Sequence, residues 1–371
     1  MLNHPSAIKL ETHPITEAES VHYYDSTSKD IIWQRGNCFG YQVDQRKGKF
    51  RVPSAPRFAP LAPLRVIRLG RRMARLDKGV CRQVADSDNL FVFYQGQTFL
   101  YDMVGQKLKR TGQFNFRNPL HGGTTVTPQG NIYFGEYFYN SAGREVKIYC
   151  SQDGGQNWDS IYQFPRNSIW HIHGVIQDPF QPDRFWIQTG DFEGQCKLLT
   201  TDDHFATVNE CGQSNQQSDK HWRSTSLMFT RDSLIWGMDS PGAQAHIIRF
   251  DRASGRIEIG QPLPGPVWYT KQLADGFAVL QTSVEWYGKF SGSTTRHANV
   301  FVSSDLVNWT SVGKFEKDRL HPFLFRHGVI HFSFGPQSVQ DFTMHGDALI
   351  GFDGESVKAC ISGASLGSST S

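Results

Sequence analysis

The fold is decided by a turn sequence, SQDGGQNW at residues 151–158, which directly follows the apolar stretch VKIYC. Asp153 opens this turn, because an aspartate carboxylate can accept hydrogen bonds from the backbone N–H groups that follow it. Short apolar stretches that end in such an aspartate recur along the chain, at Asp44, Asp102, Asp153, Asp202, Asp251, Asp305 and Asp353. After a first gap of 58 residues, the spacings are 51, 49, 49, 54 and 48. A repeat of about fifty residues is typical of solenoids, propellers and other arrays.

A second hairpin precedes these turns, as in TVTPQGNIYF at residues 125–134 and FLFRHGVIHFSF at residues 323–334. Two hairpins per repeat make a four-stranded antiparallel unit, and a ring of such units is a β-propeller. We therefore predict an all-β chain, a β-propeller with seven four-stranded blades, or six if the N-terminal unit is not a blade. Residues 7–12 are the candidate for a strand that joins the last blade to the first. We expect a single domain over residues 1–362 and a disordered tail over residues 363–371.

Composition and charge narrow the class of protein. The 371 residues carry a formal net charge of +3, without the basic stripe and interleaved aromatic residues that a nucleic-acid binder shows. The chain has no signal peptide and no apolar run of 18 residues, which predicts a cytoplasmic protein. The six cysteines are scattered and include no C-x-x-C pair. We interpret them as mostly buried thiols of a reducing compartment, with one oxidised pair left open.

Residues 151–158 carry a family resemblance. Ser151, Asp153, Gly155 and Trp158 match the Asp-box pattern S-x-D-x-G-x-x-W. A shortened copy is present at Ser303, Asp305 and Trp309, and a weaker one at Thr200 and Asp202. The chain thus resembles the BNR-repeat, sialidase-like propellers, and in that superfamily the Asp-box is a folding element of the outer hairpin, away from the active site. The sialidase arginine triad is not matched by Arg82, Arg117, Arg223 and Arg326, so the resemblance does not extend to sialic acid cleavage.

Two sets of residues are expected at the axis of the propeller. In this architecture, ligands bind where the loops entering the first strands and following the second strands converge. Positions 121, 171, 221, 271 and 321 lie fifty residues apart before the predicted first strands, and they are four histidines and Lys271. A second set, of carboxylates beside aromatic residues, follows the predicted second strands: Glu136 with Tyr137, Asp191, Asp239, and Glu285 with Trp286. Histidines and carboxylates from successive blades would then face one another across one funnel.

These sets predict a carbohydrate-active enzyme, a glycoside hydrolase or a polysaccharide lyase that acts on an acidic glycan. Two carboxyl groups suit glycoside hydrolysis, and a cation beside a His, Tyr or Lys base suits elimination from a uronic acid. The predicted catalytic residues are His171, His221, Glu136, Asp191, Asp239 and Glu285. The predicted substrate-binding residues are His121, His173, Arg223, Lys271, Tyr137, Trp222, Tyr269 and Trp286.

Two other functions remain open at this stage. In one, the propeller only binds a glycan or a protein partner. In the other, His121, His171, His221 and His321 together hold a divalent metal as a cofactor, since imidazoles from separate blades can converge on an axis. The sequence also allows that some of these histidines only bridge neighbouring blades by hydrogen bonds.

The segment 60–79 stands apart from the repeat. It carries six basic residues and one acidic residue between Leu64 and Lys78. Val66, Leu69, Met73 and Leu76 fall on one face of a helix, although Gly70 weakens that prediction. A basic amphipathic helix can lie on an anionic membrane surface, so residues 64–78 are a candidate for peripheral membrane contact. The alternative is an insertion packed against the propeller.

Overall fold

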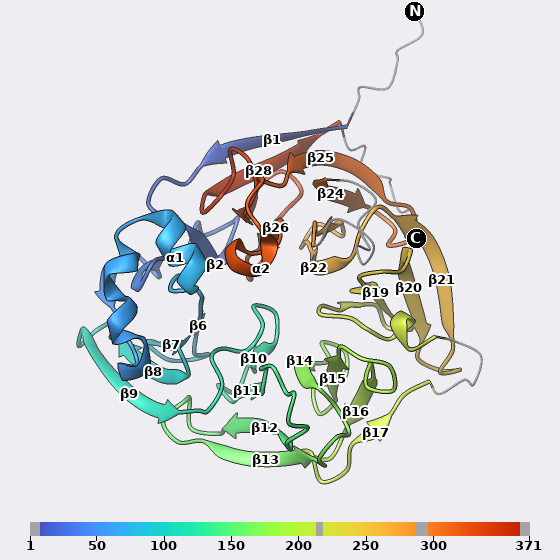
Figure 1. Ribbon diagram of the computed structural model, residues 1–371, viewed down its shortest axis with the longest axis horizontal. Coiled ribbons are helices and arrows are strands. Elements are labelled where there is room, and N and C mark those ends of the chain that lie inside the picture. Colours follow the sequence, from blue (N-terminus) through green and yellow to red (C-terminus); the bar gives the residue numbers. More distant parts are fainter. Residues whose placement is uncertain (1–7, 213–217, 286–295, 364–371) are drawn as a thin grey trace, which may run out of the picture.

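The computed structural model describes residues 8–212, 218–285 and 296–363. It is a ring of seven four-stranded antiparallel sheets, the seven-bladed propeller predicted from the repeat (Figure 1). The first three blades contain β2 (Ser20–Tyr24), β3 (Ile31–Arg35), β4 (Cys38–Val43) and β5 (Arg46–Arg51); β6 (Gly79–Gln83), β7 (Asn89–Tyr94), β8 (Gln97–Asp102) and β9 (Lys107–Gln113); and β10 (Thr124–Val126), β11 (Ile132–Gly135), β12 (Val146–Ser151) and β13 (Asp159–Phe164).

The next three blades continue around the ring in the same order, from the axis outward. They contain β14 (His171–Gln177), β15 (Phe185–Gly190), β16 (Leu198–Thr201) and β17 (Asn209–Glu210); β18 (Met228–Phe229), β19 (Ser233–Gly237), β20 (Ala245–Asp251) and β21 (Ile257–Leu263); and β22 (Val267–Gln272), β23 (Ala278–Thr282), β24 (His297–Ser303) and β25 (Thr310–Glu316).

The seventh blade closes the ring with a strand from the other end of the chain. It contains β26 (Val329–Phe332), β27 (Phe342–Asp347) and β28 (Ser356–Ser362), and its outer strand is β1 (Lys9–Pro14). β1 pairs with β28 from Lys9 opposite Ser362 to Pro14 opposite Val357. The predicted closing strand over residues 7–12 is therefore confirmed, with its start at residue 9 in place of 7. This pairing covers the outer edge of β28 and joins the N-terminal part of the chain to the last blade.

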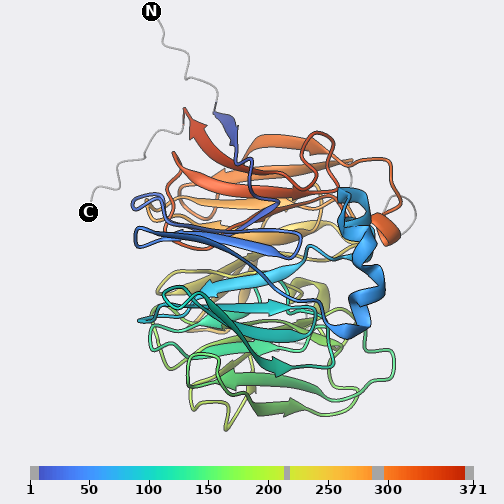
Figure 2. The same cartoon turned by 90° about the vertical axis from the view of Figure 1, so that its left-hand side faces the viewer.

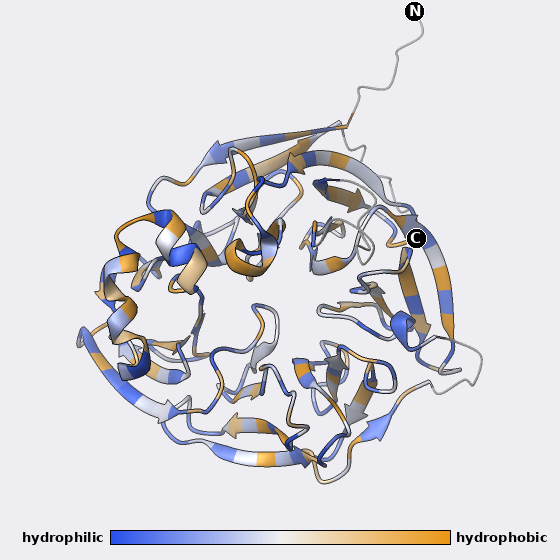
Figure 3. Cartoon of the chain, viewed as in Figure 1, coloured by the Kyte–Doolittle hydropathy of each residue, from blue (hydrophilic) through white to orange (hydrophobic). Residues whose placement is uncertain are grey.

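Burial changes regularly from the axis to the rim of each blade. Second strands such as β7, with the sequence NLFVFY, are buried almost throughout because neighbouring blades pack on both of their faces. Outer strands such as β9, with the sequence KLKRTGQ, are mostly polar and exposed. Figure 3 shows the mixed hydropathy of these rim strands. The core therefore lies between blades, in a series of apolar clusters around the ring.

The Asp-box residues form the turn that the sequence predicts. Ser151 Oγ donates to Asp153 Oδ1 at 2.7 Å and accepts from Gly155 N at 2.7 Å, and Asp153 Oδ1 also accepts from Asn157 N at 3.0 Å. The Trp158 ring packs on Phe91 and Phe134 of two neighbouring blades. Ser303 and Asp305 repeat the arrangement with a Ser Oγ–Asp Oδ1 distance of 2.9 Å.

Two assignments within the repeat need correction. The weak third Asp-box is formed by Thr201 and Asp203, one residue later than predicted, with Thr201 Oγ1 donating to Asp203 Oδ1 at 2.9 Å. Asp202 instead forms an ion pair with Arg184. Asp353 lies between β27 and β28, the second and third strands of its blade, whereas Asp153 lies between the third and fourth strands. The closing strand causes this difference, because β1 takes the place of a fourth strand that follows in sequence.

The segment between the first two blades is an insertion on one face of the ring (Figure 2). It contains a 3-10 helix, η1 (Pro56–Arg65), and a short α-helix, α1 (Arg68–Ala74), that ends at Arg75 in the left-handed region with φ 53°. The predicted single apolar face is not present: Leu76 is buried, whereas Val66, Leu69 and Met73 are exposed. Membrane contact through residues 64–78 stays a prediction, and no helix of the described residues is long and apolar enough to cross a membrane.

None of the six cysteines is paired in this structure.

Candidate functional site

A cavity of about 280 Å³ lies at the axis, on the face that carries α1. Its lining comes from the insertion and from five blades, including opposite sides of the ring. The aromatic residues in its wall are Tyr137, Trp268 and Tyr269, two of which, Tyr137 and Tyr269, are among the predicted substrate-binding residues. Convergence of loops from several blades on one concave site is the usual arrangement of a ligand site in this architecture.

The cavity carries more cations than carboxylates. Its lining includes the basic residues Arg68, Arg75, Lys78, Arg117 and Arg326 and the acidic residues Glu19, Asp77 and Asp347. All three carboxylates are engaged in ion pairs: Glu19 with Arg71, and Asp77 and Asp347 with both Arg68 and Arg326. Five positive charges against three negative ones leave a formal excess of two positive charges at this site.

The excess is concentrated at Arg75 and Arg117. Arg117 Nη2 donates to the carbonyl oxygens of Ala74 and Arg75, at 2.5 and 2.6 Å, and pairs with no carboxylate among the described residues. Burial, together with the nearby charges of Arg75 and Arg326, lowers the pKa of Arg117 to about 10. Within the same part of the chain, the Arg75 guanidinium makes no hydrogen bond or ion pair. These two guanidinium groups can therefore pair with an anionic ligand.

A group of four histidines, His22, His121, His331 and His345, also lines this cavity. His121 lies 6.1, 5.4 and 5.7 Å, between ring centroids, from His22, His331 and His345. His331 and His345 are stacked at 4.4 Å. Burial lowers the pKa of His22 to about 3 and that of His331 to about 4, and it lowers those of His121 and His345 well below the usual range. All four rings are neutral at neutral pH, so they add polar groups to the cavity without adding charge.

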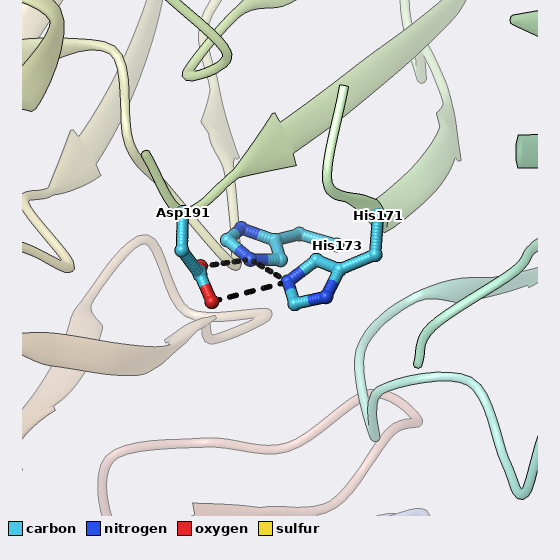
Figure 4. A group of neighbouring side chains, drawn as sticks. All are labelled: His171, His173 and Asp191. Atoms are coloured by element: carbon cyan, nitrogen blue, oxygen red, sulfur yellow. Dashed lines mark hydrogen bonds and ion pairs between the residues drawn. The ribbon is translucent and has the colours of Figure 1, made fainter. Parts of the chain in front are cut away.

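A second polar cluster lies in the fourth and fifth blades, beside the cavity (Figure 4). His171 Nε2 lies 3.0 Å from His173 Nε2 and 3.4 Å from Asp191 Oδ2, and His173 Nε2 lies 3.0 Å from Asp191 Oδ1. Arg223 Nη2 pairs with Asp191 Oδ1 at 3.0 Å, and Arg223 Nε donates to Asp239 Oδ2 at 3.2 Å. Burial opposes ionisation of Asp191, but its contacts with the two histidines and the charge of Arg223 hold its pKa well below the usual range.

Tyr137 joins the cavity to this cluster. Its ring lies 4.3 Å from that of His171, between centroids, and the same residue lines the cavity. Burial raises the pKa of the Tyr137 phenol, and the charges of Asp191 and Asp239 add to that effect. The phenol is therefore protonated at neutral pH and is a proton donor at the boundary between the two groups.

The carboxylates predicted to follow the second strands occupy equivalent places. Glu136, Asp191, Asp239 and Glu285 lie one, one, two and three residues after β11, β15, β19 and β23. Glu285 Oε1 accepts from Trp268 Nε1 at 2.9 Å, and burial with the neighbouring Asp239 charge raises the pKa of Glu285 to about 8. Glu136 instead accepts from Lys147 N at 3.0 Å within its own blade and does not line the cavity. Trp286 lies outside the described residues.

Positions 121, 171, 221, 271 and 321 do not occupy the same place in successive blades. The predicted ring of four histidines and Lys271 is therefore wrong. His121 lies three residues before β10 and His171 begins β14, whereas Lys271 is the fifth residue of β22. His221 is in the 3-10 helix η2 (Asp219–His221), and His321 is the N-cap of the short helix α2 (Pro322–Phe325). The connections between blades differ in length, so residues fifty positions apart fall in a strand in some blades and in a connection in others.

The structure consequently does not bring His121, His171, His221 and His321 together as one set of metal ligands. Among the described residues, the group whose ligand atoms lie close enough to share an ion is His171, His173 and Asp191. His121 instead contacts the carbonyl oxygen of Phe332 through Nε2 at 3.1 Å.

Four predicted substrate-binding residues do not line the cavity. His173 and Arg223 belong to the cluster with Asp191, and Trp222 and Lys271 lie elsewhere. Trp222 is buried against Trp236 and Phe250 in the core of the fifth blade, so it has no free face for a sugar ring. Lys271 donates to the carbonyl oxygen of Gly335 and lines a second cavity of about 260 Å³, which shares His121 and Tyr269 with the first. Burial lowers the pKa of Lys271 to about 7.

Sequence reasoning missed most of the cavity cations and several of its histidines. Arg75 and Lys78 belong to the segment interpreted as a basic helix, and Arg326 and His327 directly precede β26. His22 and His331 lie in the innermost strands β2 and β26, where a polar residue within an apolar stretch is the signal that could have revealed them.

Comparisons with known proteins show the fold alone. No family model matches the chain, and the search of curated proteins found no match. Among solved structures, the extracellular domain of the putative one component system BT4673 from B. thetaiotaomicron aligns with a TM-score of 0.55 and 10% identity, over 95% of this chain and 39% of that one. A chain of the Mitotic Checkpoint Complex aligns with a TM-score of 0.53 and 8% identity, over 96% and 94% of the two chains. A putative TolB from Agrobacterium tumefaciens is similar with a TM-score of 0.44 and 10% identity, over 64% of this chain and 80% of that one. At these identities, the two alignments with TM-scores of 0.55 and 0.53 support a β-propeller and say nothing of activity.

Proposed function

We propose that the chain is a carbohydrate-active enzyme that binds an acidic glycan in the axial cavity and cleaves it by elimination. The observation that carries the proposal is the composition of the cavity wall, where Arg75 and Arg117 have no carboxylate partner among the described residues and lie beside Tyr137, Trp268 and Tyr269. Guanidinium groups bind carboxylates through paired hydrogen bonds, and aromatic rings pack on the apolar faces of sugars.

Elimination fits the cavity better than hydrolysis does. Glycoside hydrolysis needs two carboxyl groups beside the scissile bond. The three carboxylates of this cavity are held by Arg68, Arg71 and Arg326, so none is available as a nucleophile or base. Elimination from a uronic acid needs instead a cation for the carboxylate, a base and a proton donor.

The residues of the cavity can take these three roles. Arg75 and Arg117 would pair with the uronate carboxylate and stabilise the negative charge that develops when the proton at C5 leaves. His327 is the candidate base, because burial lowers its pKa and leaves the ring neutral, and its Nδ1 has no hydrogen-bond partner among the described residues. The C4–O bond then breaks, the C4–C5 double bond forms, and the Tyr137 phenol gives its proton to the leaving oxygen.

The test is a screen of uronate-containing polysaccharides with two measurements on each sample. Ultraviolet absorbance reports the unsaturated uronate that only elimination forms, and a reducing-end assay reports any cleavage. We expect both signals to rise together. Reducing ends without absorbance would indicate hydrolysis, whereas thermal stabilisation by a glycan without either product would indicate the non-catalytic binding propeller.

Two substitutions and a control assign the roles. Arg75→Ala should raise KM and weaken glycan binding, and His327→Gln should lower kcat by at least about a hundredfold with binding retained. Arg256→Ala removes an exposed arginine between β20 and β21 and should change neither quantity. Equal effects of Arg75→Ala and Arg256→Ala would contradict the role of the cavity.

A further inference from the structure

We propose that His171, His173 and Asp191 bind a divalent first-row transition metal ion, for which Zn²⁺ is the best match. The inference does not depend on the proposed elimination, because it rests on the arrangement of three side chains within the fourth blade. The two rings and the carboxylate converge on one point in Figure 4.

The hydrogen bonds of the two rings fix where their lone pairs point. His171 Nδ1 lies 3.0 Å from the carbonyl oxygen of Phe138, and His173 Nδ1 lies 2.7 Å from that of Ser224. A carbonyl oxygen can only accept, so each Nδ1 carries the proton and donates it. In the neutral form of each ring, Nε2 therefore has an unprotonated lone pair. This is the tautomer of a histidine that binds a metal through Nε2, with its other nitrogen oriented by a backbone carbonyl.

Two lone pairs and a carboxylate then face one another without a proton between them. The two Nε2 atoms are 3.0 Å apart, and both lie within 3.4 Å of an Asp191 oxygen. Such an arrangement is repulsive unless a positive charge lies between the three groups. The charge is either an extra proton on one imidazole or a metal ion.

The distances match a metal ion. Zinc–nitrogen and zinc–oxygen bonds of about 2.0–2.1 Å place neighbouring ligand atoms about 3.0 Å apart at a right angle and about 3.4 Å apart at the tetrahedral angle. The two Nε2 atoms lie 3.0 Å apart, His173 Nε2 lies 3.0 Å from Asp191 Oδ1, and His171 Nε2 lies 3.4 Å from Asp191 Oδ2. Because the two carboxylate distances involve different oxygens, they fit an ion that both oxygens of Asp191 bind. Two imidazoles and one carboxylate also favour a transition metal over Ca²⁺ or Mg²⁺, which prefer oxygen ligands.

The surroundings hold the ligands in place and leave one side open. His171 and His173 are 4% and 2% exposed, and the side chain of Asp191 is 26% exposed. Gly190 packs so closely on His173 that an added Cβ would lie 2.4 Å from its Cε1 atom. The Tyr137 ring covers His171. A metal with three protein ligands keeps a further position for water or substrate, as catalytic zinc sites do.

The charges nearby can accommodate a divalent ion. Asp191 and Asp239 carry two negative charges, and Arg223, which contacts both, carries one positive charge. The cluster therefore has one negative charge in excess while the two histidines are neutral.

The experiment measures metal binding directly. The purified full-length chain is analysed for metal content, treated with a chelator, and titrated with Zn²⁺ and Mn²⁺ by calorimetry; Co²⁺ then reports the ligand geometry through its visible absorption. We expect one zinc ion per chain and a rise in thermal stability on adding Zn²⁺. No binding of any of these ions would overturn the proposal and leave the extra proton as the explanation.

Variants test the ligands individually. Asp191→Asn keeps the shape of the side chain and should weaken Zn²⁺ binding by at least about tenfold, as should His171→Gln. His345→Gln, in the other group of histidines, is the matched control and should leave Zn²⁺ affinity unchanged. Circular dichroism verifies that each variant is folded, and two separate ligand variants ensure that one misfolded protein does not decide the outcome. Unchanged affinity in both ligand variants would also overturn the proposal, whether or not the chain cleaves a glycan.

Discussion

The Asp347→Asn substitution tests whether the ion pairs beneath α1 hold the insertion and the cavity together. Asp347 lies at the end of β27, and its side chain is only 7% exposed. It contacts Arg68 Nη2 at 2.9 Å, Arg326 Nη1 at 3.0 Å and His331 Nε2 at 3.0 Å, and it also pairs with Lys78. The substitution keeps the size of the side chain and removes its charge.

The expected loss follows from the charges left behind. Asp77 would be the remaining buried carboxylate beside Arg68 and Arg326, and Lys78 would lose its partner. Breaking a buried ion pair by removing one partner costs about 3–5 kcal/mol, because the other charge stays buried without compensation. We therefore expect the free energy of unfolding, measured with urea, to fall by about 3–5 kcal/mol at neutral pH.

The effect should depend on pH in a defined direction. Burial opposes ionisation of Asp347, but Lys78, Arg326 and the hydrogen bond from His331 hold its pKa well below the usual range. An unfolded aspartate titrates near about 3.9. Because the folded pKa lies lower, this stabilisation is fully present above that value and is lost as pH falls below it. The difference between wild type and Asp347→Asn should thus shrink in acid.

An exposed ion pair provides the control. Arg184 Nε and Nη2 pair with Asp202 at 2.7 and 2.8 Å, but the Asp202 side chain is 54% exposed. Asp202→Asn should cost no more than about 1 kcal/mol. If Asp347→Asn costs as little as Asp202→Asn, the pairs beneath α1 are screened by solvent and the reasoning is refuted.

Three further outcomes follow from particular residues. Asp153→Ala should lower the free energy of unfolding by about 1–3 kcal/mol, because it removes the acceptor of the Asp-box turn, while glycan binding stays unchanged; urea unfolding and a binding titration check this. The free energy of unfolding of the wild type should rise between about pH 7 and 10, and this rise should be absent in Lys271→Met. Burial lowers the pKa of folded Lys271 to about 7, so between these pH values the unfolded chain binds one more proton than the folded chain. Urea unfolding at about pH 7 and pH 10 measures the difference. Gly190→Ala should displace His173 and weaken Zn²⁺ binding in a calorimetric titration, and wild-type affinity in this variant would contradict the packing argument.

The fold could be predicted from the sequence because its signal is local and repeated. Asp153 and Asp305 are held by hydrogen bonds to their own neighbours, so the residues that form each of these turns lie together in the sequence. Asp353 departs from the pattern because the closing strand comes from residues 9–14 and not from the residues that follow. The closing strand itself was predicted from the need for a fourth strand in the last blade.

The site could be predicted only in part because its residues depend on loops of unequal length. The carboxylates Glu136, Asp191, Asp239 and Glu285 follow second strands as predicted, since those strands are themselves regular, but none of them lines the cavity. The positions of residues before the first strands could not be predicted, because the preceding connections range from a few residues to the insertion over residues 52–78. The contact of His171 with His173 lies at a shift of register between Ile172 and Gly174 that no alternation pattern reveals.

The insertion gives this propeller its own ligand chemistry. A ring of antiparallel blades supplies a channel lined by neutral polar groups, such as His121 and the three histidines around it. Three of the five cavity cations, Arg68, Arg75 and Lys78, come from the chain between the first two blades. Arg68, at the start of α1, pairs with Asp77 and Asp347, and Arg75, at the end of α1, lines the cavity. Arg117 donates to the carbonyl oxygen of Arg75, so the two unpaired guanidinium groups are positioned by the same helix end. The buried ion pairs of Arg68 therefore position Arg75 and Arg117 at the cavity. A substitution that detaches α1 should remove anion binding even where the seven blades remain folded.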